Sequence, residues 1–228
     1  MKWHQRYKLP ISIAILIVLN ITTVHFTKAD IDKTVSGIKA APQVETLTAE
    51  SIKQAKFEKV LNNNPSAKKN LGYHIPKVAE TAIMLCDSYK EQGITIPILM
   101  GIIEVESNFN YLAVGRAKDG FTPESYGLMQ IKPGTAIPIL NDLGYRWTTE
   151  SLLKPNINMM VGTVHLLALH YQFMKIGIEG KNEFHVSLMS YNRGTKSVLN
   201  SMKNGTGVPL NYMAKVKIAS RKWERAGF

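Results

Sequence analysis

The feature that most restricts the fold is an apolar stretch over residues 98–107, which reads ILMGIIEVES. A helix over these residues carries apolar side chains nearly all round, so we expect it to lie buried at the centre of a helical domain. Thr95 is suited to cap its N-terminus, and Pro97 suits its first turn. Two carboxylates, Glu104 and Glu106, lie near the end of this otherwise apolar helix and need an explanation.

Glu106 is the more embedded of the two carboxylates. Residues three and four positions back share a helix face, and for Glu106 these are Ile103 and Ile102, whereas Glu104 has Gly101 there. A carboxyl group among apolar side chains has a raised pKa, because its ionised form is poorly solvated. Such an acid can protonate a glycosidic oxygen near neutral pH. Glu106 is therefore a candidate general acid, although buried carboxylates are also often structural partners of arginines or backbone donors.

The rest of the body also has helical periodicity, and no segment shows a convincing alternation of period two. Expected helices cover about residues 75–89, 98–107, 154–173, 182–191, 195–202 and 210–223. The sequence thus predicts a mostly α, single globular domain of about six helices over residues 75–228, with little or no sheet. A chain of 228 residues suits one such domain plus a tail.

The N-terminal 29 residues are typical of an export segment. Residues 1–8 are basic and residues 9–19 are mostly apolar, a run that is short for a membrane span. Small residues at 27–29 suit cleavage of a signal peptide, and the alternative is a retained N-terminal membrane anchor. Both predict an exported protein in the periplasm or cell envelope, anchored to the inner membrane if the segment is uncleaved. Residues 30–74 are expected to form a linker or loosely packed segment, with one polar helix over 49–61.

The formal charge of +11 favours anionic partners. No basic run is interleaved with aromatic residues, so nucleic acid is not an expected partner, whereas an anionic membrane or a carboxylate-bearing wall polymer fits. No metal or other cofactor is expected, because His165 and His170 are five residues apart and splay on a helix. Cys86, the one cysteine, is expected to be a small core residue.

Four motifs in order indicate a family. They are Glu106-Ser107, residues 125–131 (SYGLMQI), Asn156-Ile157 with a later Gly162, and residues 190–194 (SYNRG), followed by a late Tyr212. Together they resemble the lytic transglycosylase domain of the soluble (SLT) type, within the lysozyme-like superfamily. The match covers about residues 75–216, so residues 75–228 are expected to form the catalytic domain.

The resemblance implies a substrate, a reaction and a set of site residues. The substrate would be the glycan strands of peptidoglycan, cut at the β-1,4 bond between N-acetylmuramic acid and N-acetylglucosamine. Glu106 would act first as acid and then as base, and the product would carry a 1,6-anhydromuramoyl end. Tyr191 would lie with its hydroxyl near Glu106. Substrate contacts are expected from Ser107, Met129, Gln130, Tyr191, Asn192 and Tyr212, with Asn192 also bracing a turn and Ser107 also able to cap the helix end.

Two other functions stay open. The interval over residues 115–124 is longer than in compact family members and holds Asp119, and goose-type lysozymes of related fold carry acids there and hydrolyse their substrate. A second carboxylate can activate water, although Asp119-Gly120 is also typical of a turn. The other alternative is a non-catalytic peptidoglycan-binding component of an envelope-spanning apparatus. By analogy alone, secretion, conjugation or phage machinery are candidate partners.

Overall fold

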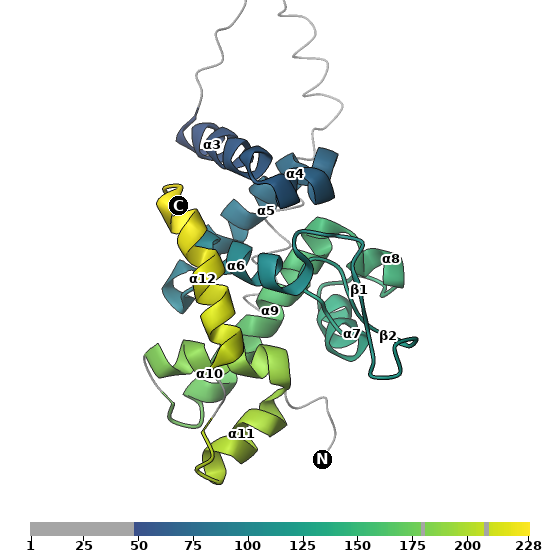
Figure 1. Ribbon diagram of the computed structural model, residues 1–228, viewed down its shortest axis with the longest axis vertical. Helices are drawn as coiled ribbons and strands as arrows, with labels where there is room; N and C mark the ends of the chain where they lie inside the picture. The colour runs from purple at the N-terminus through teal and green to yellow at the C-terminus, as the bar shows by residue number, and fades with distance from the viewer. Residues whose placement is uncertain (1–47, 179–180, 208–209) are drawn as a thin grey trace, which may run out of the picture. The chain divides into compact units, whose positions relative to one another are not determined.

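The computed structural model describes residues 48–178, 181–207 and 210–228 (Figure 1). The chain divides into two units, residues 1–53 and residues 54–228, and the second contains nearly all of the described part. The expected signal peptide or anchor over residues 1–29 lies outside the described residues. Within the described ranges, no helix is both long and apolar enough to cross a membrane.

The described elements are almost all helical, which confirms the predicted mostly α fold. In chain order they are α3 (Ala49–Asn63), α4 (Pro65–Leu71), η2 (Gly72–His74), α5 (Ile75–Ser88), η3 (Lys90–Gln92), α6 (Ile96–Ser107), β1 (Val114–Arg116), β2 (Pro123–Tyr126), α7 (Pro133–Asp142), α8 (Thr149–Leu152), α9 (Pro155–Met174), α10 (Lys181–Arg193), α11 (Thr195–Lys203) and α12 (Asn211–Arg225).

Helix α6 is the buried central helix that its sequence predicts. Ile102 and Ile103 have no exposed surface, and Thr95 caps the helix by accepting a hydrogen bond from the Ile98 amide. Helix α12 packs along α6 (Figure 1). Their close approach depends on Gly101, because a Cβ there would lie 2.4 Å from Ser220 Oγ. This packing brings the C-terminal helix against the helix that carries both candidate carboxylates.

Helices α7 and α8 and the hairpin of β1 and β2 are additions to the expected elements. The α7 sequence, PGTAIPILND, contains two prolines and a glycine, of which Pro133 occupies the first turn and Pro138 lies inside the helix. Prolines usually break helices, so the pattern is not typical of one. The strands of the antiparallel hairpin have three and four residues, too few for an alternation to be visible.

Residues 54–71 are more closely packed than the linker or loosely packed segment expected over residues 30–74. They belong to the same compact unit as the rest of the body, and Phe57, Leu61 and Ala67 are fully buried. The Phe57 ring lies 4.8 Å from the Phe228 ring and 6.1 Å from the Trp223 ring, between ring centroids. A short polar-looking helix therefore still contributes to the core, while the predicted domain boundary at residue 75 stays a prediction.

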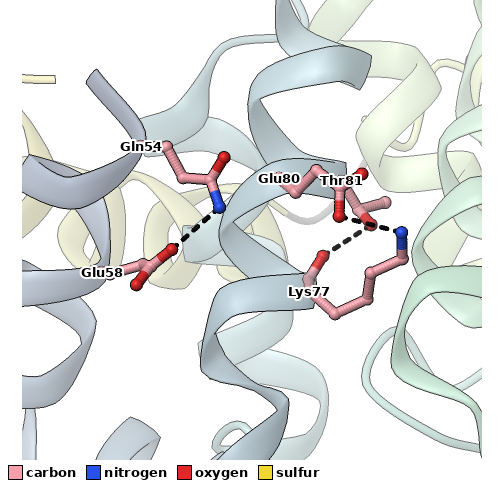
Figure 2. A network of polar contacts seen from close by, with 5 residues as sticks. All are labelled: Gln54, Glu58, Lys77, Glu80 and Thr81. Atoms are coloured by element: carbon pink, nitrogen blue, oxygen red, sulfur yellow. Dashed lines mark hydrogen bonds and ion pairs between the residues drawn. The ribbon is translucent and has the colours of Figure 1, made fainter. Parts of the chain in front are cut away.

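The polar contacts that Figure 2 shows on α3 and α5 are each local to one helix. Gln54 donates to Glu58 over 2.9 Å, and Lys77 contacts Glu80 over 2.8 Å, four and three residues along their helices. The Thr81 hydroxyl donates to the Lys77 carbonyl oxygen over 2.7 Å. Pairs of this kind add only about 0.2–0.5 kcal/mol each to their own helix. The packing of α3 rests instead on its buried Phe57 and Leu61, together with a long-range hydrogen bond from Lys56 Nζ to the Gly227 carbonyl oxygen over 3.2 Å.

Candidate active site

Glu106 lies in the last turn of α6, where the helix ends sharply. Asn108 adopts a left-handed conformation (φ 50°), and Phe109 (φ 65°) turns inward until its ring centroid is 5.7 Å from that of Trp223. The buried Phe109 fixes the direction in which the chain leaves the helix. Glu106 is consequently held at the end of a rigid, apolar element rather than on a loop.

Tyr212 of α12 is the hydrogen-bond partner of Glu106. Its hydroxyl donates to Glu106 Oε1 over 2.6 Å. Burial raises the pKa of Glu106, and the hydrogen bond from Tyr212 lowers it in part, so the net pKa is above the ordinary value. A phenol donor that favours the carboxylate, combined with an apolar setting that favours the acid, suits a group that must hold both protonation states in turn.

Glu104 has a different partner. It forms an ion pair with Lys222 of α12, and its side chain is 19% exposed. Its partner is therefore a cation, whereas the partner of Glu106 is a phenol hydroxyl. The contacts therefore agree with the sequence argument that separates Glu106 from Glu104.

The loop that connects β2 to α7 lies against the Glu106 end of α6. The Ser107 hydroxyl donates to the Leu128 carbonyl oxygen over 2.8 Å and shares its proton with the Ile103 carbonyl over 3.2 Å. The Tyr191 hydroxyl donates to the Met129 carbonyl oxygen over 2.7 Å. Two side chains from distant parts of the sequence thus fix this loop beside Glu106.

Asn158 of α9 completes the support of the loop, and sequence reasoning missed it. It is fully buried, accepts from the Met129 amide over 2.7 Å, and donates to the carbonyl oxygens of Tyr126 and Leu152 over 2.8 Å each. Gly127 fits beside Asn158 only because it has no side chain, since a Cβ there would lie 2.3 Å from Asn158 Nδ2. Nothing in the local sequence pattern distinguishes Asn158 from Asn156, two residues earlier on the same helix.

Gln130 braces the hairpin. It has a left-handed backbone (φ 48°), its Nε2 donates to the carbonyl oxygens of Gly127 and Ala113, and its Oε1 accepts from Ser125. Gly115 must lack a side chain, because a Cβ there would lie 2.6 Å from Gln130 Oε1. These contacts tie the longer interval over residues 115–124 to the loop beside Glu106, and a contact of Gln130 with substrate stays a prediction.

The other expected substrate contacts fall in different places. Met129 is fully buried, and its side chain lies where a Cβ on Gly162 would be 2.5 Å from its sulfur atom. The Met129 side chain is thus enclosed by protein while its carbonyl oxygen accepts from Tyr191, and a substrate contact of Met129 stays a prediction. Asn192 is exposed at the end of α10. Tyr212 is almost fully buried, with its hydroxyl on Glu106.

The Tyr191 ring packs against the ring of His165. The two ring centroids are 5.4 Å apart, and burial lowers the pKa of His165 to about 4, so this imidazole is neutral at physiological pH. Burial and then the charge of Glu106 raise the pKa of Tyr191. The Tyr191 phenol thus stays protonated as a donor near Glu106. In the described part of the chain, no three His, Cys, Asp or Glu side chains gather as a metal site.

Asp119 occupies a surface turn at the tip of the hairpin. Its carboxylate accepts hydrogen bonds from the amides of Phe121 and Thr122 over 2.9 Å each and from the Thr122 hydroxyl. These bonds lower its pKa. Because the Asp119 carboxylate accepts hydrogen bonds from residues of its own turn, its geometry is that of a residue that stabilises the turn.

Glu106 has a raised pKa at the end of a buried helix and accepts a hydrogen bond from Tyr212, in a mostly α body. These features fit a lysozyme-like domain. Residues 87–209 match the family described as the transglycosylase SLT domain. This range covers more than half of the chain, and the chain belongs to that family. The motifs between Glu106 and residue 194 therefore indicated the family correctly.

Curated relatives carry the same name in several bacteria. The membrane-bound lytic murein transglycosylase C of Glaesserella parasuis is 30% identical over 118 residues, which make up 50% of this chain and 31% of that relative. Its counterpart in Edwardsiella ictaluri is 27% identical over 143 residues, covering 60% of this chain and 38% of the relative. The chain thus spans about a third of the length of these relatives.

Proposed function

We propose that the protein is a peptidoglycan lytic transglycosylase and that Glu106 is its acid and base. The observation that carries the proposal is the hydrogen bond from the Tyr212 hydroxyl to Glu106, whose pKa is raised by burial among apolar side chains. Family membership supports the same activity. A module that only docks on glycan strands has no need of an acid in this setting.

The reaction proceeds in two steps on one carboxyl group. Protonated Glu106 gives its proton to the glycosidic oxygen, and the bond from that oxygen to muramoyl C1 breaks while the acetamido oxygen of the same sugar attacks C1. The Glu106 carboxylate then takes the proton of the muramoyl 6-hydroxyl, whose oxygen attacks C1 and displaces the acetamido oxygen. The 1,6-anhydro ring closes, Glu106 regains its proton, and no water is consumed.

The two tyrosines have distinct tasks in this scheme. Because Tyr212 donates to Oε1, Oε2 is the oxygen that carries and exchanges the proton. The Tyr212 bond strengthens when Glu106 becomes a carboxylate after the first step, since hydrogen bonds to charged groups are stronger than neutral ones. Tyr191 holds the Met129 carbonyl and thereby the loop beside the acid. Substrate contacts by Ser107, Gln130 and Asn192 belong to the same proposal.

The Tyr212→Phe change should alter both the rate and its pH dependence. It removes a hydrogen bond to a charged group, so we expect turnover to fall about 10- to 100-fold. The lost bond is the one that lowers the pKa of Glu106, so that pKa rises further. Protonated Glu106 is needed for the first step, and activity is lost as pH rises through its pKa. The high-pH limb of the pH–rate profile should therefore move to higher pH, and an unshifted limb would contradict this role.

Asp119→Asn should be almost silent, with turnover within about twofold of the parent. Asparagine keeps the side-chain oxygen that accepts from the Phe121 and Thr122 amides, so the turn survives. The measurement is the initial rate of product release from peptidoglycan. A large loss of turnover with unchanged thermal stability would favour hydrolysis with Asp119 as the second carboxylate.

Digestion of purified peptidoglycan, with mass spectrometry of the products, separates the proposed function from its alternatives. Anhydromuropeptides that disappear in the Glu106→Gln variant support the lyase. Reducing-end products would indicate a hydrolase of the same fold. Binding without any release would leave a non-catalytic component. We place the enzyme in the cell envelope, in keeping with its substrate, and its N-terminal anchoring and any partner apparatus stay predictions.

A further inference from the structure

Three aromatic rings gather on the surface next to the end of α6. Tyr73 and His74 of η2 stack with ring centroids 4.0 Å apart, and the His74 ring meets the edge of the Tyr111 ring at 4.5 Å. The Tyr73 side chain is 82% exposed, while His74 and Tyr111 are half-buried. Burial and the adjacent Tyr73 phenol raise the pKa of Tyr111, so the hydroxyl groups of Tyr73 and Tyr111 are neighbours. We call Tyr73, His74 and Tyr111 the aromatic cluster.

The aromatic cluster is fixed in place, although Tyr73 is so exposed. Leu71 and Ile75, on either side of η2, are buried, and Gly72 makes the turn between them with a φ of 53°. Asn70 donates to the Asn108 carbonyl oxygen over 2.8 Å, which ties the end of α4 to the end of α6. An exposed ring on a fixed backbone loses little conformational entropy when it binds a ligand.

The aromatic cluster lies close to the candidate acid. Tyr111 follows Glu106 by five residues, so their Cα atoms are at most about 18 Å apart even for a fully extended chain. Asn108, the anchor point of Asn70, lies between them in sequence. A polymer bound at Glu106 is therefore within a few sugar units of the exposed Tyr73 ring.

We propose that the aromatic cluster is a binding site for a sugar of the same glycan strand, a few units away from the bond that is cut. This rests on the proposed function for the identity of the ligand. The C–H face of a pyranose ring is apolar and packs on an aromatic face, while phenol hydroxyls bond acetamido groups and hydroxyls. The continuity of the aromatic cluster with the Glu106 end of α6 selects a glycan strand as its occupant.

Two further observations distinguish Tyr73 from the residues of the family match and from another exposed aromatic side chain. Tyr73 and His74 precede the family match, which begins at residue 87. Phe121, the other aromatic side chain with 82% exposure, stands on the tip of the hairpin without a ring contact among the described pairs. Tyr73 and His74 thus lie outside the matched range, Tyr111 lies inside it, and Phe121 supplies a control of equal exposure.

Binding tests the proposal without requiring turnover. The probe is peptide-free glycan strands, titrated by calorimetry into the full chain carrying Glu106→Gln. We expect added Tyr73→Ala to weaken binding about 3- to 10-fold, Tyr73→Trp to restore it, and Phe121→Ala to leave it unchanged. Unchanged binding in Tyr73→Ala, or an equal loss in Phe121→Ala, would overturn the proposal.

Kinetics give a second, separate readout in the active protein. Tyr73→Ala should raise KM for glycan strands by the same factor and leave kcat within twofold, because the ring is remote from the reacting bond. A fall in kcat at constant KM would contradict a remote binding site. Failure of the proposed function looks different: strands would bind with the expected Tyr73 dependence while no anhydro product forms.

Discussion

Glu106→Gln should reduce the release of anhydro products by about 10²- to 10⁴-fold, the range expected for loss of a positioned general acid. Glutamine keeps the size of the side chain and an oxygen that accepts from Tyr212, but it carries no proton to give and no charge with which to take one. Both steps of the reaction lose their proton carrier. The measurement is the initial rate of product formation at saturating peptidoglycan.

Glu104→Gln is the matched control, two residues earlier on the same helix. It breaks the ion pair with the partly exposed Lys222 and should leave turnover within about twofold, with a stability loss of no more than about 1 kcal/mol. A loss of turnover in Glu104→Gln equal to that in Glu106→Gln would contradict the assignment of the two carboxylates.

The stability of Glu106→Gln gives an independent check on burial. Because the folded-state pKa of Glu106 is raised, its ionisation opposes folding above the unfolded-state pKa, and more so as pH rises through the folded-state value. Glutamine avoids this penalty, so the variant should be at least as stable as the parent at neutral pH. Inactivity with preserved stability then reports chemistry rather than unfolding.

Asn158→Ala should have the largest effect on stability. It leaves the Met129 amide and the carbonyl oxygens of Tyr126 and Leu152 without their buried partner. We expect the free energy of unfolding to fall by about 2–4 kcal/mol, since each unsatisfied buried group costs about 1–3 kcal/mol and the loop relaxes in part. Urea unfolding measures this as a lower midpoint with an unchanged slope.

Asn158→Ala should also reduce activity in the fraction that remains folded, because Tyr191 braces the same loop at the Met129 carbonyl. Asn156→Ala is the matched control, a half-buried asparagine in the first turn of the same helix. It should change stability by about 0.5 kcal/mol or less. Equal losses in the two variants would mean that the buried hydrogen bonds of Asn158 are not what supports the loop.

The sequence was sufficient where one short pattern decides the structure. The all-round apolar character of residues 98–107 predicted the buried helix α6, and the capping by Thr95 is confirmed. The choice of Glu106 over Glu104 followed from the side chains three and four positions back, and the Lys222 contact gives Glu104 a separate role. Local periodicity and side-chain chemistry carry this information within one or two turns.

Local sequence patterns could not predict the contacts between segments that are distant in the sequence. The bond between Tyr212 and Glu106 joins residues 106 positions apart, and only the family resemblance drew attention to Tyr212. Asn158 was missed because nothing local separates an asparagine that bonds three backbone groups from one on a surface. The burial of Phe57 against Phe228 was missed for the same reason, since the pattern of α3 is polar and its partner is the last residue.

We expect the single carboxyl group of Glu106 to cut the glycan strand without water. Digestion of peptidoglycan in water labelled with heavy oxygen, with mass spectrometry of the new muramoyl ends, distinguishes this reaction from hydrolysis. We expect 1,6-anhydro ends that contain no label, in amounts that vanish with Glu106→Gln. Labelled reducing ends from the wild-type protein would contradict this account and show that Glu106 acts in a hydrolase.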